Sequence, residues 1–427
     1  MKKIITFLVV FLISHLTFAQ TPWDGVTITP VTPDAKWNYT VTSAAELAWI
    51  AQECNNGNNF NARLILITDD IDLNNKPWTP IGRKDAPFKG TFEGNWKIIK
   101  NINVVDTDYV GLFGYIEGRD YKTLYEISNL FVENVNITGQ NYVGGIVGFA
   151  KYYVFDSCYV STGTVEGNNN VGGFVGYAAT SAIKDCYAKV SVTANENYGG
   201  GFIGLYDTNE SGVALISYCY ARGNVSGNGI NGGFVGYNNS KIRSAYTVTT
   251  GITGDTLGLF CGFSSSIGAF INCYFCNSYN PSATGIGNLD DAANDVYGVA
   301  SAGLKQINQI SNLNGSDAYV HWERDLQPFI NDGFPIHIWQ GDYLGVSISS
   351  YNNFTLSIFP NPVKNTLNIK FENINLLKLE IVDLLGKPVI TKQADFELID
   401  VNSLKSGIYF LKLYTDKETI TKKFIKQ

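Results

Sequence analysis

The chain has 427 residues, with 31 Lys and Arg against 38 Asp and Glu, which gives a formal net charge of −7. This acidic balance argues against a protein that neutralises nucleic-acid phosphates, so no nucleic-acid partner is expected. A hydrophobic content of 45% with only 16% charged residues excludes a largely disordered chain. The 43 glycines and the single methionine disfavour a helix bundle, and the length predicts more than one domain.

The N-terminal segment has the pattern of a secretory signal peptide. Lys2 and Lys3 precede an apolar run at residues 4–12 that is interrupted only by Thr6, and the small residue Ala19 follows. We therefore expect residues 1–19 to be a signal peptide that is cleaved between Ala19 and Gln20. The apolar run is short for a membrane anchor, and no membrane span is expected in the mature chain.

Residues 20–60 are predicted to cap the N-terminal end of the repeat array that follows them. Ser43 and Glu46 have the spacing of a capping box. They predict a short helix over residues 44–54, which would cover the first coil of a repeat structure.

Residues 61–294 contain an internal repeat. The pattern Val-Gly-Gly-Phe-Val-Gly-Tyr recurs, and a Cys-Tyr pair follows about ten residues later in most units. The last glycines of the copies are Gly114, Gly148, Gly176, Gly204, Gly236 and Gly262. Short β-prone segments without a helical period predict an all-β fold in which each unit forms one coil of a parallel β-helix. Adjacent coils would then lie about 4.8 Å apart.

These motifs resemble the GLUG-motif repeat family of bacterial surface and secreted proteins. The lead-in at residues 88–95 and the exit at residues 331–336 match the same pattern, and the resemblance covers residues 38–340. It implies a right-handed parallel β-helix and a role in adhesion or surface binding.

The C-terminal part of the chain changes character. Residues 295–341 are expected to close the solenoid, residues 342–353 to form a linker, and residues 354–427 to form a small antiparallel β-sandwich, because their strands alternate in hydropathy. Four sequence elements resemble the type A sorting domain of the type IX secretion system. The matching residues are Pro360, Asn361, Pro362, Gly386, Gly407, Tyr409 and Lys423.

The resemblance of this domain implies a partner and an address. The partner is the type IX secretion machinery, and the expected location is secreted or on the outer-membrane surface of a Gram-negative, Bacteroidota-type bacterium. It also implies removal of the sorting domain after export.

Four cysteines recur at one position of successive units, namely Cys158, Cys186, Cys219 and Cys273. We expect an inward stack of unpaired thiols, because parallel side chains in register rarely reach the torsion that a disulfide needs. Cys273 and Cys276 form a C-x-x-C, but neither a helix nor further ligands accompany it. No metal and no cofactor are therefore expected.

Two further motifs have structural explanations. Residues 227–232 match G-x-G-x-x-G, but no helix pattern follows them, which favours a coil corner over a nucleotide site. Asp70 and Asp72 are spaced as in a calcium loop, without the glycine and closing glutamate of such loops. Strand alternation accounts for them more simply.

The tyrosines that follow the repeated position are candidate ligand-binding residues. If the cysteines point inward, alternation places the next side chains outward, as a column with one ring per coil. The column would offer ring faces and hydroxyls to a glycan chain. The alternative is a self-stacking ladder that stabilises the coils, and a bend at the cysteines could also replace the alternation. The residues are Tyr159, Tyr187, Tyr220, Tyr246 and Tyr274.

The first functional hypothesis is a non-enzymatic secreted or cell-surface binding protein, either an adhesin or a carbohydrate-attachment module. Its ligand would be a polysaccharide or a host or cell-surface molecule. The alternative is a polysaccharide lyase or glycoside hydrolase, for which Asp156, Lys184 and Asp185 are candidate residues although no catalytic set can be assigned. A structural surface-layer component is a third hypothesis. Enzyme activity is the less favoured interpretation.

Overall fold

The computed structural model describes residues 22–208, 214–265, 269–315, 319–326, 329–343, 355–360, 362–372, 376–383, 387–415 and 419–427. The predicted signal peptide and its cleavage site at Ala19 and Gln20 lie outside these residues. The chain divides into two compact units. One reaches Leu304 and includes residues 311–315, and the other comprises residues 305–310 and 316–427.

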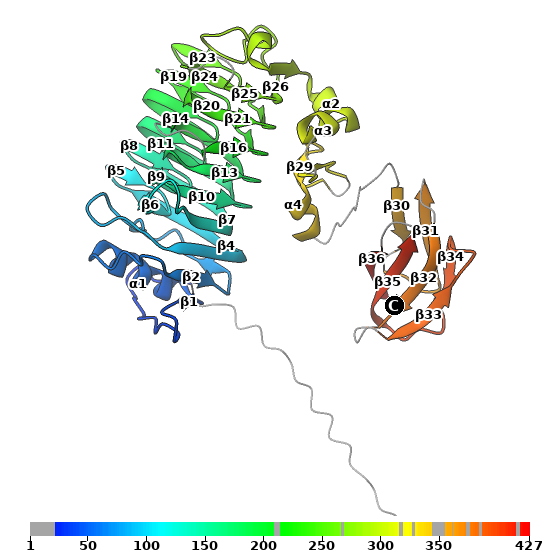
Figure 1. Cartoon of the computed structure of the whole chain (residues 1–427). Coiled ribbons are helices and arrows are strands. Elements are labelled where there is room, and N and C mark those ends of the chain that lie inside the picture. The colour runs from blue at the N-terminus through cyan, green and yellow to red at the C-terminus, as the bar shows by residue number, and fades with distance from the viewer. Residues whose placement is uncertain are drawn as a thin grey trace, which may run out of the picture. The chain divides into compact units, whose positions relative to one another are not determined.

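The first unit is a parallel β-helix, as the repeat predicts (Figure 1). A six-stranded parallel sheet forms one face, with the strand order β24-β20-β15-β12-β9-β6. Its strands are β6 (Phe113–Glu117), β9 (Val147–Lys151), β12 (Val175–Ala179), β15 (Ile203–Asp207), β20 (Val235–Asn239) and β24 (Cys261–Ser264).

The remaining faces belong to a sheet of 21 strands in which all the pairings are parallel. The strands are β1 (Tyr39–Val41), β2 (Leu64–Ile67), β3 (Ile71–Asp72), β4 (Thr91–Val105), β5 (Asp108–Val110), β7 (Tyr125–Thr138), β8 (Asn141–Gly144), β10 (Tyr153–Asp156), β11 (Tyr159–Gly172), β13 (Ala182–Lys184), β14 (Tyr187–Gly200), β16 (Leu215–Ser217), β17 (Tyr220–Arg222), β18 (Val225–Gly227), β19 (Ile230–Gly232), β21 (Lys241–Arg243), β22 (Tyr246–Val248), β23 (Thr256–Gly258), β25 (Phe270–Ile271), β26 (Cys273–Cys276) and β27 (Val296–Val299).

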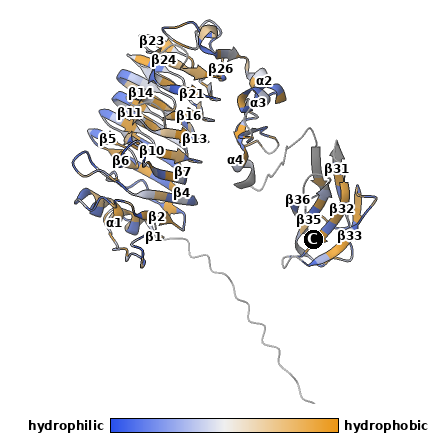
Figure 2. Ribbon diagram, in the orientation of Figure 1, coloured by the Kyte–Doolittle hydropathy of each residue, from blue (hydrophilic) through white to orange (hydrophobic). Residues whose placement is uncertain are grey.

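Equivalent residues of successive repeats lie in register, so like side chains stack inside the solenoid. The phenylalanine of the repeated motif forms an internal ladder, with ring centroids 4.8 Å apart for Phe174 and Phe202, 4.9 Å for Phe202 and Phe234, and 5.0 Å for Phe234 and Phe260. Hydrophobic and hydrophilic residues are interleaved along the coils (Figure 2). Alternation thus fills one continuous core and leaves polar residues on the outside.

Parallel strand pairing includes residues on both sides of the range 61–294 that was predicted for the solenoid. Tyr39 in β1 pairs with Ile65 in β2, so the stack begins within the region expected to be a cap only. Cys273 in β26 pairs with Val296 in β27, so it continues to Val299 rather than ending at residue 294.

The helix α1 (Ala44–Asn55) is inserted between the first two strands. Ser43 Oγ accepts a hydrogen bond from the Glu46 backbone N–H at 3.3 Å, as the capping box predicts. The Glu46 carboxylate accepts from the Thr42 backbone N–H at 2.6 Å. The reciprocal bond thus goes to the residue before the N-cap. The apolar side of α1 is buried in the same core as the coils through Leu47 and Ile50.

A left-handed residue bends the chain just before each repeated cysteine or its equivalent. The φ angles lie between 51° and 55° at Asn129, Ser157, Asp185, Tyr218, Ser244 and Asn272. Short polar residues adopt this conformation more readily than bulky ones, which explains why Asn, Asp and Ser predominate there. The bend forms the corner between two faces of the coil.

The short helix η1 (Ala292–Asn294) lies just before β27. The segment after the solenoid contains α2 (Ser301–Leu304), α3 (Ile307–Asn314), β28 (Trp322–Glu323), β29 (Ile336–His337) and α4 (Ile338–Tyr343). Within the second unit, β28 and β29 pair antiparallel. The buried Asp325 carboxylate accepts backbone N–H groups of Ile330, Asn331 and Gly333 at 2.9, 2.7 and 2.7 Å. These bonds hold the loop of the exit motif. That residues 295–341 close the solenoid stays a prediction.

The C-terminal residues form the predicted antiparallel sandwich. One sheet contains β30 (Thr355–Phe359), β31 (Thr366–Glu372) and β34 (Leu398–Asp400). The other contains β32 (Leu376–Val382), β33 (Pro388–Lys392), β35 (Gly407–Thr415) and β36 (Thr419–Lys426). Residues such as Leu367, Ile381 and Leu411 form its own core. Among the described residues of the whole chain, no helix is long and apolar enough to cross a membrane.

Candidate functional site

The five predicted tyrosines form one row across the coils. The register pairs Tyr159 with Tyr187, and continues through Tyr220 and Tyr246 to Tyr274. Ring centroids are 4.8, 4.6 and 5.1 Å apart along the first four rings, whose planes lie within 11° of parallel. The register therefore places one tyrosine in each successive coil.

The row is buried, which differs from the exposed column that alternation suggested. The exposed fractions of its five side chains are 7, 7, 0, 0 and 7% in chain order. Near-parallel stacking also occupies the ring faces that a sugar would need, and the Tyr159 hydroxyl donates to Glu133 at 2.6 Å. Alternation gives the direction of a side chain but not what covers it. This geometry favours a ladder that stabilises the coils, and ligand binding by the row stays a prediction.

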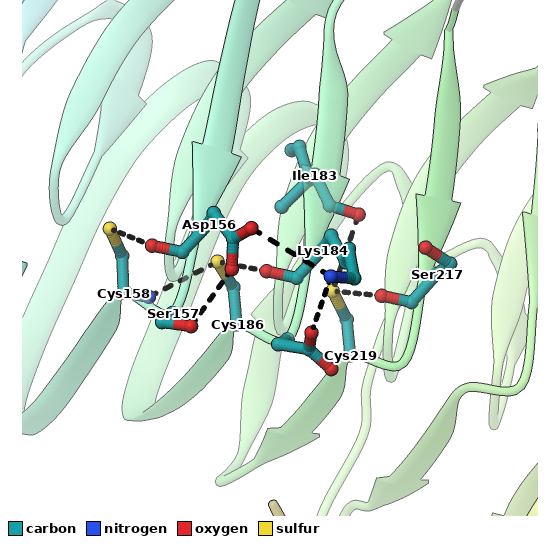
Figure 3. Close-up of polar contacts among 9 residues, drawn as sticks. Asp156, Ser157, Cys158, Ile183, Lys184, Cys186, Ser217 and Cys219 are labelled. Carbon is teal, nitrogen blue, oxygen red and sulfur yellow. Dashed lines mark hydrogen bonds and ion pairs between the residues drawn. The ribbon is translucent and has the colours of Figure 1, made fainter. Parts of the chain in front are cut away.

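The four repeated cysteines belong to the core of the solenoid, as predicted, and Figure 3 shows three of them, Cys158, Cys186 and Cys219. The thiols of Cys186 and Cys219 donate to the carbonyls of Lys184 and Ser217 at 3.0 and 3.2 Å. All seven cysteines of the chain are buried free thiols. Burial raises the pKa of Cys273 to about 12 and the pKa of Cys186 and Cys219 well above the ordinary value. Protonated thiols are poor nucleophiles and metal ligands.

The other two short motifs have structural roles. Residues 227–232 join β18 to β19 at a coil corner, without a following helix. Asp70 accepts the Ile98 backbone N–H at 2.9 Å, and Asp72 accepts from Asn101 Nδ2 at 2.7 Å. In the described part of the chain, no group of three or more His, Cys, Asp or Glu side chains is arranged to hold a metal ion.

The candidate catalytic residues lie together, although no cluster of them was predicted. Lys184 Nζ is 3.8 Å from Asp156 Oδ2 and 3.2 Å from Asp185 Oδ2. Desolvation lowers the pKa of Lys184, but the two carboxylates outweigh it and raise that pKa above its ordinary value. The lysine is therefore held in its charged form, which is not the form that a general base needs. The cluster acts as an ion pair between neighbouring coils.

A different row of side chains, aromatic except for one leucine, lies on the outer face of the six-stranded sheet. The last residues of the repeated motifs are paired in register between neighbouring strands of this sheet, so they form one row. These side chains are partly exposed. They are Tyr115, Phe149, Tyr177, Leu205, Tyr237 and Phe263.

A second row lies at the corner just before this sheet. Tyr109, Tyr142 and Tyr198 have φ angles of 62°, 59° and 58°, and Asn170 takes the equivalent place between the last two. The motif glycine explains how the rows meet: a Cβ on Gly148 would lie 2.5 Å from the Tyr142 carbonyl oxygen and 2.6 Å from the Tyr109 carbonyl carbon. Only glycine permits this approach of two backbones.

The two rows together form what we call the aromatic strip. It comprises Tyr109, Tyr115, Tyr142, Phe149, Tyr177, Tyr198, Leu205, Tyr237 and Phe263. Some of its rings stack, as Tyr115 does on Phe149 at 4.5 Å and 15°. Others meet edge to face, as Phe149 and Tyr177 do at 5.0 Å and 80°. The strip differs from the buried row because its side chains are partly exposed and because some of its rings meet edge to face.

Polar groups border the strip on the same sheet. Lys151 Nζ lies 3.3 Å from Glu117 Oε1, and Asp207 accepts from Asn239 Nδ2 at 2.7 Å. Partial burial raises the pKa of Tyr115 to about 12, and the neighbouring Glu117 carboxylate adds to the effect. Burial and then Asp207 likewise raise the pKa of Tyr177 to about 12. Both phenols are neutral hydrogen-bond donors over the physiological pH range.

Sequence reasoning treated these aromatics as part of the repeat and did not single them out. The signal was present in segments such as Tyr115-Ile116-Glu117 and Phe149-Ala150-Lys151. In each, alternation puts an aromatic and a charged residue on one outer face, with a buried aliphatic residue between them.

The sorting-motif residues lie in or beside the strands of the sandwich. Pro360 and Pro362 are exposed after β30, whereas Asn361 and Gly386 lie outside the described residues. Gly407 begins β35, and the Tyr409 hydroxyl donates to the Lys405 carbonyl at 3.0 Å. Lys423 in β36 pairs with Phe410. Their role in export stays a prediction.

Comparison with known families assigns two parts of the chain. No curated protein matches the sequence. Residues 167–193, which run from β11 into β14, match the GLUG motif. Residues 357–427 match the secretion system C-terminal sorting domain. Residues 167–193 of the β-helix therefore carry a GLUG motif, and the C-terminal residues form a type IX sorting domain, which implies interaction with the type IX secretion machinery and secretion or cell-surface attachment in Bacteroidota-type bacteria.

Proposed function

We propose that the protein is a non-enzymatic, carbohydrate-binding adhesin or attachment module that acts outside the cell. The observation that carries this proposal is the aromatic strip, with partly exposed rings on a rigid parallel sheet. Aromatic rings with hydroxyl groups offer both apolar area and hydrogen bonds, which suits the amphipathic surface of a sugar chain. The sorting domain supports this proposal, because secretion or cell-surface attachment would bring the strip near extracellular polysaccharides.

The rigid β-helix favours binding because the rings of the aromatic strip are already held in place before a ligand binds. The strip side chains stand on strands that are paired in register on both sides for most of the sheet. Preorganisation of this kind lowers the entropy that association costs.

The alternative of a polysaccharide lyase or hydrolase finds less support. Its candidate residues, Asp156, Lys184 and Asp185, are engaged in an ion pair with a lysine held in its charged form. A lyase needs a base able to take a proton, and a hydrolase needs a carboxylate pair across a substrate.

The test uses residues 20–427, incubated with algal, plant and host polysaccharides. Retention on each polymer, new reducing ends and the absorbance of unsaturated uronates are followed in the same tubes. We expect retention without new ends or absorbance. New ends or absorbance would favour the enzyme, and no response in any measurement would contradict carbohydrate binding and favour a protein ligand or a structural role.

A further inference from the structure

We propose that the aromatic strip binds an uncharged polysaccharide that runs along the solenoid axis, crossing one coil per ring. This inference rests on the proposed function and names its site and its class of ligand. The strip, rather than the buried tyrosine row, would then be the ligand-contacting surface of the repeat.

The spacing of the strip supports a chain that lies parallel to the axis. Neighbouring rings of the motif-closing row are 4.5 Å apart for Tyr115 and Phe149, 5.0 Å for Phe149 and Tyr177, and 5.6 Å for Tyr237 and Phe263. These distances follow from the coil repeat of about 4.8 Å. A pyranose unit in an extended chain has a similar length, so successive sugars would meet successive coils.

The charges beside the strip decide against an acidic polysaccharide. Lys151 is paired with Glu117 at 3.3 Å, so its charge is compensated. In the corner row, burial raises the pKa of Tyr142, the charge of Asp108 raises it further and the charge of Lys84 lowers it. Asp207 adds a further carboxylate, bonded to Asn239. The carboxylates outnumber the lysines, so a uronate or sulfate chain would be repelled.

The hydrogen-bonding groups of the strip match sugar hydroxyls. Tyr115 and Tyr177 keep neutral hydroxyls that can both donate and accept. The Tyr177 hydroxyl reaches Asp207 Oδ2 only at 3.5 Å, a long contact that a sugar hydroxyl could replace. Asp207 and Asn239 supply acceptor and donor atoms in the next column of the sheet.

At one position of the strip, a substitution can be made that should strengthen the site instead of removing it. Leu205 stands in register between Tyr177 and Tyr237 and is the one aliphatic member of the strip. Its side chain points outward and is partly exposed. Leu205→Tyr would complete the row without enlarging a core side chain.

The experiment measures affinity for soluble neutral glucan, xylan and galactomannan, and for alginate and polygalacturonate, at low and high salt. It uses residues 20–427 as wild type, as Tyr177→Ala with Tyr237→Ala, and as Leu205→Tyr. Tyr279→Ala is the matched control, since that ring is 51% exposed and lies off the strip. Circular dichroism melts check that each variant is folded.

We expect the double variant to bind a neutral polymer about tenfold more weakly or worse, Leu205→Tyr to bind severalfold more tightly, and the control to be unchanged. Salt should have little effect. If the wild type binds a glycan but the strip variants bind equally well, the strip is not the site and the proposed function stands. Preference for the acidic polymers that is lost at high salt would overturn the ligand class. If the wild type binds no polysaccharide, both the proposed function and this inference fail.

Discussion

The buried tyrosine row should contribute to stability, and Tyr220→Ala tests this most sharply. Tyr220 is fully buried, and its ring stacks between Tyr187 at 4.6 Å and Tyr246 at 5.1 Å. Replacing a buried aromatic residue by alanine costs about 3–5 kcal/mol, because burial is lost and a cavity remains. Against a typical free energy of unfolding of about 5–15 kcal/mol, this is a large fraction.

The assay is urea unfolding of residues 20–427, followed by tryptophan fluorescence and by hydrogen exchange of the coil amides. Tyr237→Ala is the matched control, because its ring stands in the partly exposed strip. We expect the control to lose less than half as much stability as Tyr220→Ala. Polysaccharide binding should show the reverse order, with Tyr220→Ala unaffected below its melting temperature. A loss below about 1 kcal/mol for Tyr220→Ala, or an equal loss for both variants, would refute the assignment of the row to stability.

Three further predictions concern the coils. Gly148→Ala should lower the melting temperature by several degrees, because the new Cβ would lie 2.5 Å from backbone atoms. Gly251→Ala should have little effect, since the atom nearest to its Cβ is 3.5 Å away. Equal melting temperatures of the two variants would contradict the close approach at Gly148. The buried thiols should not react with a thiol reagent at mildly alkaline pH, and all seven should react after denaturation; rapid labelling of the native protein would contradict their burial. Tyr115 and Tyr177 have pKa values raised from 10 to about 12, so the folded state binds more protons than the unfolded state between these values, and stability should fall as pH rises through this window. Ultraviolet titration that shows both phenolates forming near pH 10 would contradict this prediction.

The stacking of the coils could be predicted well from the sequence, because each repeat unit has similar residues at equivalent positions. The motif phenylalanines, the inward cysteines and the capping helix all follow from patterns that recur or that are local, such as the Ser43 cap. The first strand was missed because α1 separates it from its partner, and Tyr39 pairs with Ile65 across that insertion.

The candidate site was harder to predict, for a physical reason that the two aromatic rows illustrate. Alternation predicted an outward-facing Tyr187, yet the exposed fraction of its side chain is only 7%. The period of a strand says nothing about what lies over its outer face. Conversely, Tyr177 belongs to the repeated motif that predicts the fold, yet its strand position leaves it partly exposed. The three-dimensional structure is needed to distinguish the buried tyrosine row from the partly exposed aromatic strip.

The measurement that tests the central claim most directly is co-sedimentation of residues 20–427 with an insoluble neutral polysaccharide. The wild type and the Tyr177→Ala, Tyr237→Ala double variant are compared in the same experiment. The account predicts that the wild type sediments with the polymer, while most of the folded double variant stays in the supernatant. Equal sedimentation of both proteins, or none of either, would contradict it.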